Sequence, residues 1–223
     1  MKKVVRVLVV LFVVLMICSC ATAASKEFKK EYEALNGQVN KSGKEHRSIT
    51  IDKDNPFEKV SAKEILEKID NKETFFVYFG DELCPWCRSV IEKAIEVAKK
   101  NKVKKIYYVK IWDKDGNEVL RSKYSLTDDN NIETVFEGTK EYHELLNHFD
   151  SLLSDYTLTD KDGNKVQTNE KRIYAPNFIY VENGVAKKLE EGISSKQTES
   201  RMELTDEMLK DEEELFNAFF KVD

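Results

Sequence analysis

The sequence predicts an α/β fold in which helices flank a central mixed sheet. Strand and helix patterns alternate through residues 48–111, and this β-α-β-α-β order implies right-handed crossovers between parallel strands. Further along the chain, Asn183-Gly184 separates two strand patterns, which is a strong signal for a two-residue hairpin. The hairpin adds antiparallel strands to the parallel ones, so the sheet is expected to be mixed.

The first elements are justified by their apolar patterns and caps. A short strand is expected at 48–51, and Ser61 followed by Glu64 forms a capping box at the start of a helix. The run over 75–79 is almost continuously apolar, as a central strand buried on both faces requires. A helical pattern over 85–100 follows this strand.

The next strand is expected at 106–111, after which residues 112–170 interrupt the alternation as an insertion. Within this insertion, apolar residues at helical spacing predict a helix over 139–154. Two short strand patterns at 156–159 and 165–167 flank a turn and predict a hairpin.

The last part of the chain completes the sheet and covers it. Pro176 begins an apolar strand, and the return strand of the Asn183-Gly184 hairpin spans 185–189. An amphipathic helix then closes the chain over 208–220.

The N-terminus has the pattern of a targeting segment. Basic residues precede an apolar run over 7–17, which is too short to span a bilayer but suits a signal peptide. Residues 17–20, Ile-Cys-Ser-Cys, resemble the bacterial lipobox. On this resemblance 1–20 is a lipoprotein signal peptide, Cys20 is the lipidated residue, and the protein lies on the outer face of the cytoplasmic membrane.

Two alternatives remain for this segment: an uncleaved anchor, or a secreted protein cut after Ala23 or Ala24. The following residues, 21–47, are polar and rich in Lys and Glu, and Gly37 and Gly43 interrupt them. We expect a tether there, with space for a short helix, and a single domain over 48–223.

Composition limits the function classes. The chain has 223 residues, enough for one domain with a substantial core, and a net charge of −5 without a basic block. Nucleic acid is therefore not an expected partner.

The cysteine count directs attention to one pair. Of the four cysteines, Cys18 would leave with the signal peptide and Cys20 would be lipidated, so that Cys84 and Cys87 remain free. A disulfide between them closes a very small loop and adds little stability, so its value lies in reactivity. The pair follows a buried strand and opens a helix, whose N-terminal N–H groups favour thiolate over thiol.

The alternatives for this pair are half of a zinc site or an inert structural pair. Structural zinc takes four ligands, and the sequence has no second cysteine pair and only three histidines. No metal site is therefore expected.

Three sequence features together resemble the thioredoxin fold: Tyr78-Phe79-Gly80 leading into Cys84-Pro85-Trp86-Cys87, then Ala175-Pro176, and the 181–184 turn. The resemblance covers 48–192 and the final helix, with 112–170 partly inserted. It implies that Pro176 follows a cis peptide bond and that Ala175 offers its backbone to a bound substrate.

The lipobox, the strand before the cysteines and the inserted helix look most like thioredoxin-like lipoproteins of Gram-positive bacteria, some described as bacteriocin transport accessory proteins. Two positions depart from the usual pattern. Tyr78 stands where thioredoxins have a buried acid, while Asp81 and Glu82 fall in the loop. Pro85-Trp86 between the cysteines is closer to the glutaredoxin pattern.

The resemblance implies a membrane-tethered, extracytoplasmic thiol–disulfide oxidoreductase. Cys84 would be the nucleophile and Cys87 the resolving thiol, with no cofactor beyond the disulfide that they form. The residues expected to position the substrate are Pro85, Trp86, Ala175 and Pro176. Expected partners are protein thiols or disulfides outside the membrane and a membrane electron-transfer partner. Whether the protein reduces, oxidises or isomerises disulfides is not set by the sequence. The alternative is a docking module for a secreted peptide or a transporter, in which the cysteines are incidental.

Overall fold

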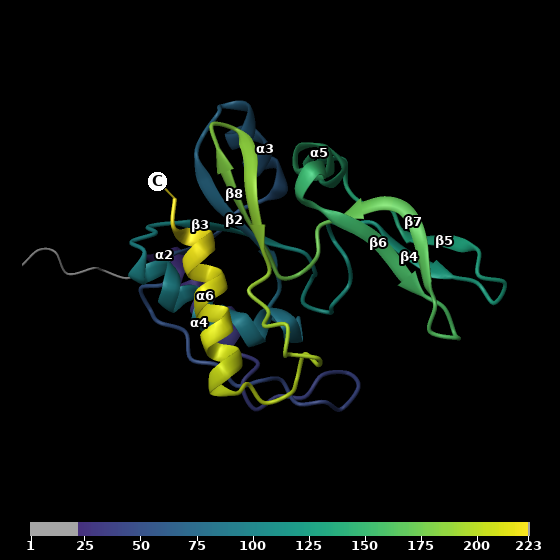
Figure 1. Ribbon diagram of the computed structural model, residues 1–223, viewed down its shortest axis with the longest axis horizontal. Coiled ribbons are helices and arrows are strands. Elements are labelled where there is room, and N and C mark those ends of the chain that lie inside the picture. The colour runs from purple at the N-terminus through teal and green to yellow at the C-terminus, as the bar shows by residue number, and fades with distance from the viewer. Residues whose placement is uncertain (1–21, 223) are drawn as a thin grey trace, which may run out of the picture.

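The computed structural model describes residues 22–222, and its centre is a five-stranded mixed sheet in the order β1-β3-β2-β8-β9 (Figure 1). The strands are β1 (Phe57–Lys59), β2 (Phe75–Gly80), β3 (Ile106–Lys110), β8 (Asn177–Glu182) and β9 (Val185–Glu190). β3 pairs in parallel with both β1 and β2, whereas β8 is antiparallel to β2 and to β9. The predicted mixed sheet of an α/β fold is therefore confirmed.

Helices cover both faces of this sheet. They are α2 (Ala23–Glu33), α3 (Ala62–Asp70), α4 (Pro85–Lys100), α5 (Lys140–Phe149) and α6 (Asp206–Phe220), with a 3-10 turn, η1 (Asp150–Leu152), after α5. Helices α2, α4 and α6 share a core with one face of the sheet, and α3 and α5 share a core with the other.

Alternation along the strands assigns side chains to these two cores. Tyr78 and Phe178 are paired across β2 and β8 and face α2, α4 and α6. The next pair, Val77 and Ile179, faces α3 and α5. All six residues of β2 are buried, because helices cover it on both sides and strands flank it on both edges.

The inserted segment divides into a helix that joins the core and two hairpins that do not. The hairpins pair β4 (Lys123–Leu126) with β5 (Ile132–Phe136), and β6 (Ser154–Thr159) with β7 (Lys165–Arg172). They project together from the sheet as an arm, on the right in Figure 1. The hairpin of β6 and β7 was predicted, whereas that of β4 and β5 was not, because its polar turn at 127–131 separates strands with little apolar alternation.

Two sequence-based expectations on the N-terminal side are wrong. Residues 48–51 form no strand, although Ile49 and Ile51 are buried, and the first strand is β1. Residues 22–47 are not a flexible tether, because α2 packs on the sheet through Phe28 and Tyr32, which are 2% and 0% exposed. These two side chains are four apart and share one helix face.

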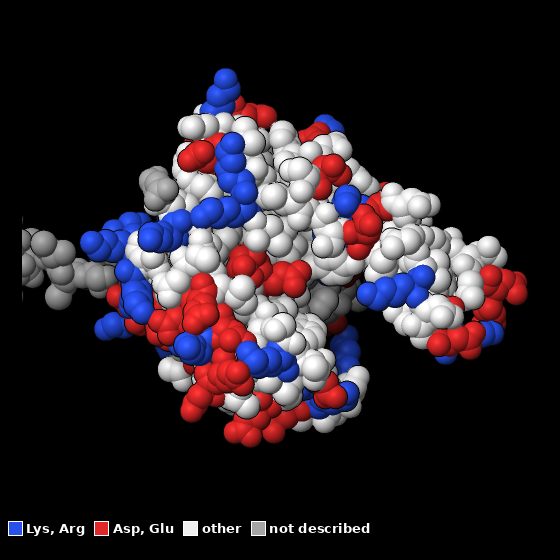
Figure 2. All heavy atoms as spheres, in the orientation of Figure 1, with Lys and Arg blue, Asp and Glu red and all other residues white. Residues whose placement is uncertain are grey.

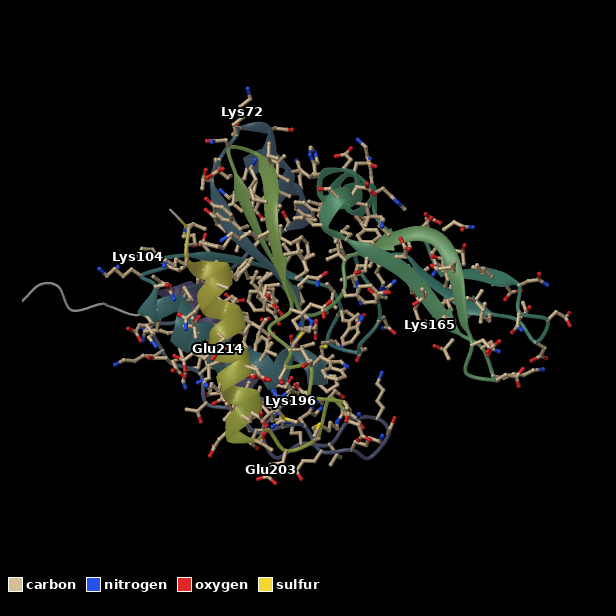
Figure 3. The ribbon with its side chains drawn as sticks, viewed as in Figure 1. Lys72, Lys104, Lys165, Lys196, Glu203 and Glu214 are labelled. Atoms are coloured by element: carbon tan, nitrogen blue, oxygen red, sulfur yellow. The ribbon has the colours of Figure 1, made fainter. Side chains whose placement is uncertain are left out.

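The signal peptide over 1–20 and the lipidation residue Cys20 lie outside the described residues. Within 22–222, no helix is both long enough and apolar enough to cross a membrane. In the view of Figure 2, acidic side chains gather over α6, and lysine and arginine side chains are interspersed or lie along one edge. Figure 3 shows the charged side chains of Lys72, Lys165 and Glu203 at three separate edges, pointing away from the interior.

Candidate functional site

The two cysteines lie where β2 ends and α4 begins. Cys84 is the N-cap residue of α4, Pro85 occupies the first turn, and Cys87 lies within that turn. Proline is favourable at this place because the helix needs no N–H there. Both thiols are free and buried, with 4% of Cys84 and 0% of Cys87 exposed. Only Cys84 is thus within reach of another molecule at the surface.

The Ala175–Pro176 segment forms the wall beside Cys84. The Cys84 Sγ donates to the carbonyl oxygen of Ala175 at 3.5 Å, and the Ala175–Pro176 peptide bond is cis. Trp86 and Ala175 are both partly buried against the core cluster that contains the two cysteines. The structure therefore brings together Cys84, Trp86 and Ala175. Ala175 is 91 residues from Cys84 in the sequence.

The two thiols have opposite acidities. A hydrogen bond from the Cys87 side chain lowers the pKa of Cys84, and the backbone N–H groups of Cys87 and Trp86 and the charge of Arg121 act in the same direction. Burial raises the pKa of Cys87 well above its usual value, and the neighbouring Cys84 adds to this effect. Cys84 is therefore the more acidic thiol of the pair and Cys87 the less acidic one, which is the order that a nucleophile and a resolving thiol need.

A buried ion cluster supplies the positive charge near Cys84. Arg121, in the loop after β3, donates through Nε to Glu118 Oε2 at 3.1 Å and through Nη1 to the carbonyl of Ile173 at 3.1 Å. Arg172 reaches the same carboxylate, with Nη2 3.3 Å from Glu118 Oε1. Because two guanidinium groups share one carboxylate, the cluster retains a net positive charge.

Cys87 faces a buried pair of tyrosines. Tyr78 lies in the same buried cluster as Cys87, and its side chain lowers the pKa of that thiol, partly offsetting the effect of burial. The hydroxyl of Tyr78 is also 2.9 Å from the hydroxyl of Tyr32, on α2. Both side chains are 0% exposed. Gly80 makes room for this arrangement, since a Cβ atom there would lie 2.1 Å from the Tyr78 hydroxyl oxygen.

Asp81 and Glu82 are buried rather than solvated, at 0% and 8% exposure. Asp81 accepts backbone N–H groups of Leu83 at 2.9 Å and Trp112 at 3.2 Å. Burial, followed by the charge of Glu82, raises the pKa of Asp81 to about 8. Glu82 forms an ion pair with Lys110. An acidic group that titrates near neutral pH therefore lies in the loop that leads to Cys84.

Arg88, the cation nearest to the cysteines in sequence, binds the N-terminal segment. Its guanidinium is fully buried and donates to the carbonyl of Tyr32 at 2.7 Å, the carbonyl of Arg47 at 2.8 Å and Asn36 Oδ1 at 2.8 Å. These bonds attach the segment after α2 to the active-site helix.

Within 22–222, no three His, Cys, Asp or Glu side chains are grouped so that they could hold a metal ion. No known protein-family profile matches the chain, and no curated protein is significantly similar to it in sequence.

Sequence reasoning found Cys84 and Cys87 but missed Tyr32 and Arg121 as their neighbours. The spacing of Phe28 and Tyr32 was a signal that α2 has a buried face, although not of what it contacts. No local pattern marks Arg121, because its position depends on how the inserted segment returns to the sheet.

Proposed function

We propose that this protein is a thiol–disulfide oxidoreductase of thioredoxin-like fold, attached by a lipid to the outer face of the cytoplasmic membrane. The observation that carries the redox proposal is the cysteine pair itself. Cys84 has a lowered pKa, a small exposed fraction and the Ala175 carbonyl beside it, whereas Cys87 is fully buried with a raised pKa. Such an asymmetric pair favours sequential attack and resolution.

In the reductive direction, the Cys84 thiolate attacks one sulfur of a substrate disulfide. The bond between Cys84 and that sulfur forms, the substrate S–S bond breaks, and the other sulfur leaves as a thiolate. Cys87 then attacks Cys84 Sγ, which forms the Cys84–Cys87 disulfide and releases the remaining substrate thiol. The substrate gains two electrons and the protein loses two; the oxidative direction is the reverse.

The neighbouring residues have roles that follow from their positions. Ala175 presents its carbonyl next to Cys84, so an extended substrate chain would meet backbone atoms at the point of attack. Pro85 and Pro176 hold the two loops that flank the thiol, and the half-buried Trp86 limits access from the solvent side. Proteins that carry thiols or disulfides are the substrates that this arrangement suits.

The redox proposal is tested by trapping. In Cys87→Ser, Cys84 should attack substrates but remain joined to them, so mixed disulfides should accumulate that a reductant releases. Cys84→Ser is the matched control and should accumulate none. If neither Cys87→Ser nor the wild-type protein exchanges with any dithiol or protein disulfide, the proposal is wrong.

The direction of transfer is measured by equilibrating the pair with glutathione. A reduction potential in the range of thioredoxin would indicate a reductase supplied by a membrane electron donor, whereas a much higher value would indicate an oxidase. The lipid anchor is tested by Cys20→Ala, which should lose fatty-acid labelling and leave the membrane fraction.

The docking alternative drew its sequence support from Tyr78 in place of a buried acid. Tyr78 lies in the buried cluster that holds both cysteines and lowers the pKa of Cys87, so that support is weaker. The double variant Cys84→Ser/Cys87→Ser distinguishes the two functions, because full complementation of a deletion strain by it would favour docking.

A further inference from the structure

The negative charge of the chain as a whole does not extend to all of its surface. Five of the seven residues over 99–105, where α4 ends and the chain turns toward β3, are lysines. The chain therefore does contain a short basic block, contrary to the expectation drawn from its net charge of −5. Because the block lies in one turn, it acts at one surface of the domain.

Side-chain contacts join this turn to two other segments of the chain. Lys99 Nζ lies 2.9 Å from Asp54 Oδ1, in the loop before β1. The same loop contacts the start of α2, where Ser25 Oγ donates to the carbonyl of Lys53 at 2.9 Å. Three segments therefore form one continuous surface, which we call the basic surface: 22–33, 52–59 and 99–105.

The basic surface carries an excess of positive charge. It holds ten lysines against six aspartate and glutamate residues. Some of these lysines are paired, as Lys105 is with Glu58 at 2.5 Å. Figure 2 shows lysine and arginine side chains gathered at the left edge, near α2, and Figure 3 shows Lys104 there, pointing away from the interior. Five lysines of the basic surface are exposed and have no ion pair within 22–222: Lys26, Lys30, Lys53, Lys102 and Lys104.

The fold accounts for some of these lysines but not for Lys102 and Lys104. Lys99 and Lys100 lie in the last turn of α4, where positive charge interacts favourably with the helix dipole. Lys102 and Lys104 follow the cap residue Asn101, outside that turn. Lys102 also has a φ of 60°, a left-handed conformation that glycine adopts with less strain. Local structure therefore does not explain the charge at these two positions.

We propose that the basic surface binds the anionic headgroups of membrane phospholipids. The chain enters the domain on this surface, because Thr22 caps α2, so a lipid on Cys20 would bring the same surface to the bilayer. Screening limits the attraction between lysines and anionic lipids to about 10 Å, so only a surface close to the anchor can use it. The inference rests on the lipid anchor of the proposed function and adds an electrostatic attachment to it.

The basic surface and Cys84 lie at opposite ends of α4. Cys84 is the N-cap residue of this helix, and Lys99 and Lys100 are its last two residues. A helix of 16 residues is about 24 Å long. Binding of headgroups at one end therefore leaves Cys84 accessible to substrates at the other.

The test measures binding to vesicles without the lipid anchor. It uses residues 22–223, which retain every strand of the central sheet and the helices of both cores. The vesicles contain either phosphatidylcholine alone or equal parts of phosphatidylcholine and the anionic phosphatidylglycerol, and bound protein is measured by co-sedimentation. We expect binding to the anionic vesicles at low salt, loss of this binding at high salt, and none to phosphatidylcholine alone. No binding to the anionic vesicles at low salt, or equal binding to both kinds, would overturn the inference.

Lys102→Gln/Lys104→Gln removes two of the exposed charges. Binding to the anionic vesicles should weaken about 25-fold, because each lysine near such a surface contributes about five-fold, the equivalent of ~1 kcal/mol. The matched control is Lys161→Gln/Lys165→Gln, which changes the net charge equally but at exposed positions on the arm, where Figure 3 shows Lys165. Equal weakening in the two double variants would indicate an effect of net charge alone and would overturn the inference.

Lys102→Gly separates binding from stability. Glycine relieves the left-handed strain at this position, so the free energy of unfolding should not fall, whereas binding to the anionic vesicles should weaken about five-fold. Binding as tight as that of the wild type in this variant would contradict the role of Lys102.

Two further measurements separate this inference from other interpretations. Tighter binding to an oligonucleotide than to the anionic vesicles, in the same salt, would assign the basic surface to a different polyanion and overturn the inference. If fatty-acid labelling shows no lipid on Cys20, the proposed anchor is wrong, while the vesicle measurement still decides the electrostatic attachment because it uses no anchor.

Discussion

The two cysteines are three positions apart in the chain, yet they face regions with different chemistry. On the side of Cys84, the inserted segment brings charged groups, with Arg121 and Arg172 around Glu118. On the side of Cys87, aromatic rings and neutral hydroxyl groups surround the sulfur. A cation suits a thiol that should ionise readily, whereas a buried, apolar site keeps the second thiol protonated. The acidity of the attacking thiol and that of the resolving thiol are therefore set by separate parts of the chain.

The largest expected effect comes from breaking the charged side at Glu118. Its carboxylate accepts from Trp112 Nε1 at 2.9 Å as well as from the two arginines, and it is 6% exposed. Glu118→Gln leaves two buried guanidinium groups without their counter-charge, so we expect a loss of about 3–5 kcal/mol in the free energy of unfolding. Urea unfolding followed by circular dichroism measures this change.

Glu133→Gln is the control for this substitution, because Glu133 is exposed on β5, in the arm. Its effect should stay within about 0.5 kcal/mol. Equal losses for the two variants would show that the buried cluster has no special role in stability.

A carboxyl group on the other side of the molecule sharpens the comparison. Glu212 on α6 is 0% exposed, and neither of its oxygens has a hydrogen-bond partner within 22–222. Burial raises its pKa from the ordinary 4.5 to about 7. Between these two values the folded state binds more protons than the unfolded state, so stability falls as pH rises through this window and does not recover above it.

Glu212→Gln removes the group that becomes charged. At pH 8 we expect the variant to be more stable than the wild type by roughly 1–3 kcal/mol, whereas below pH 4.5 the difference should be small. Thermal unfolding at several pH values measures it, with the exposed Glu214→Gln as the control. A gain of the same size at pH 4 and pH 8 would contradict this account of Glu212.

The smallest expected effect concerns the acidity of Cys84. Arg121→Gln removes one of the charges that lower the pKa of Cys84, so this pKa should rise and the thiolate fraction at a given pH should fall. The contribution of one such charge is on the order of 1 kcal/mol, which corresponds to a several-fold slower alkylation of Cys84. Thiolate absorbance during a pH titration measures the shift directly. A lower pKa in Arg121→Gln would contradict the assignment of Arg121.

The elements of the sheet were predictable because their patterns are local. The continuous apolar run of β2, the Asn183-Gly184 turn between β8 and β9, and the capping box at Ser61 each specify one element without knowledge of the rest. The arm was predicted in part, since β4 and β5 have mostly exposed or half-buried side chains and no clear alternation.

Local sequence patterns predicted only the part of the site whose residues are close together in the sequence. Cys84 and Cys87 share one helix start, so their spacing revealed them, and the resemblance supplied Ala175 and its cis bond to Pro176. Tyr32 approaches Tyr78 from 46 residues away in sequence, a contact that no local pattern encodes. The sequence predicts a solvated Asp81 because acidic residues in loops usually are exposed, but its carboxylate is buried and accepts backbone N–H groups, one of them from Trp112, 31 residues away.

The early start of α2 has a consequence for where the thiols work. Thr22 already caps this helix, so if Cys20 carries lipid, a single residue separates the anchor from the folded domain, and the two steps along the chain reach about 7 Å. A flexible segment over 21–47 would instead have a root-mean-square reach of about 30 Å. The domain would therefore lie against the bilayer surface with a restricted orientation. Its partners would be chosen by their height above the membrane as well as by their chemistry.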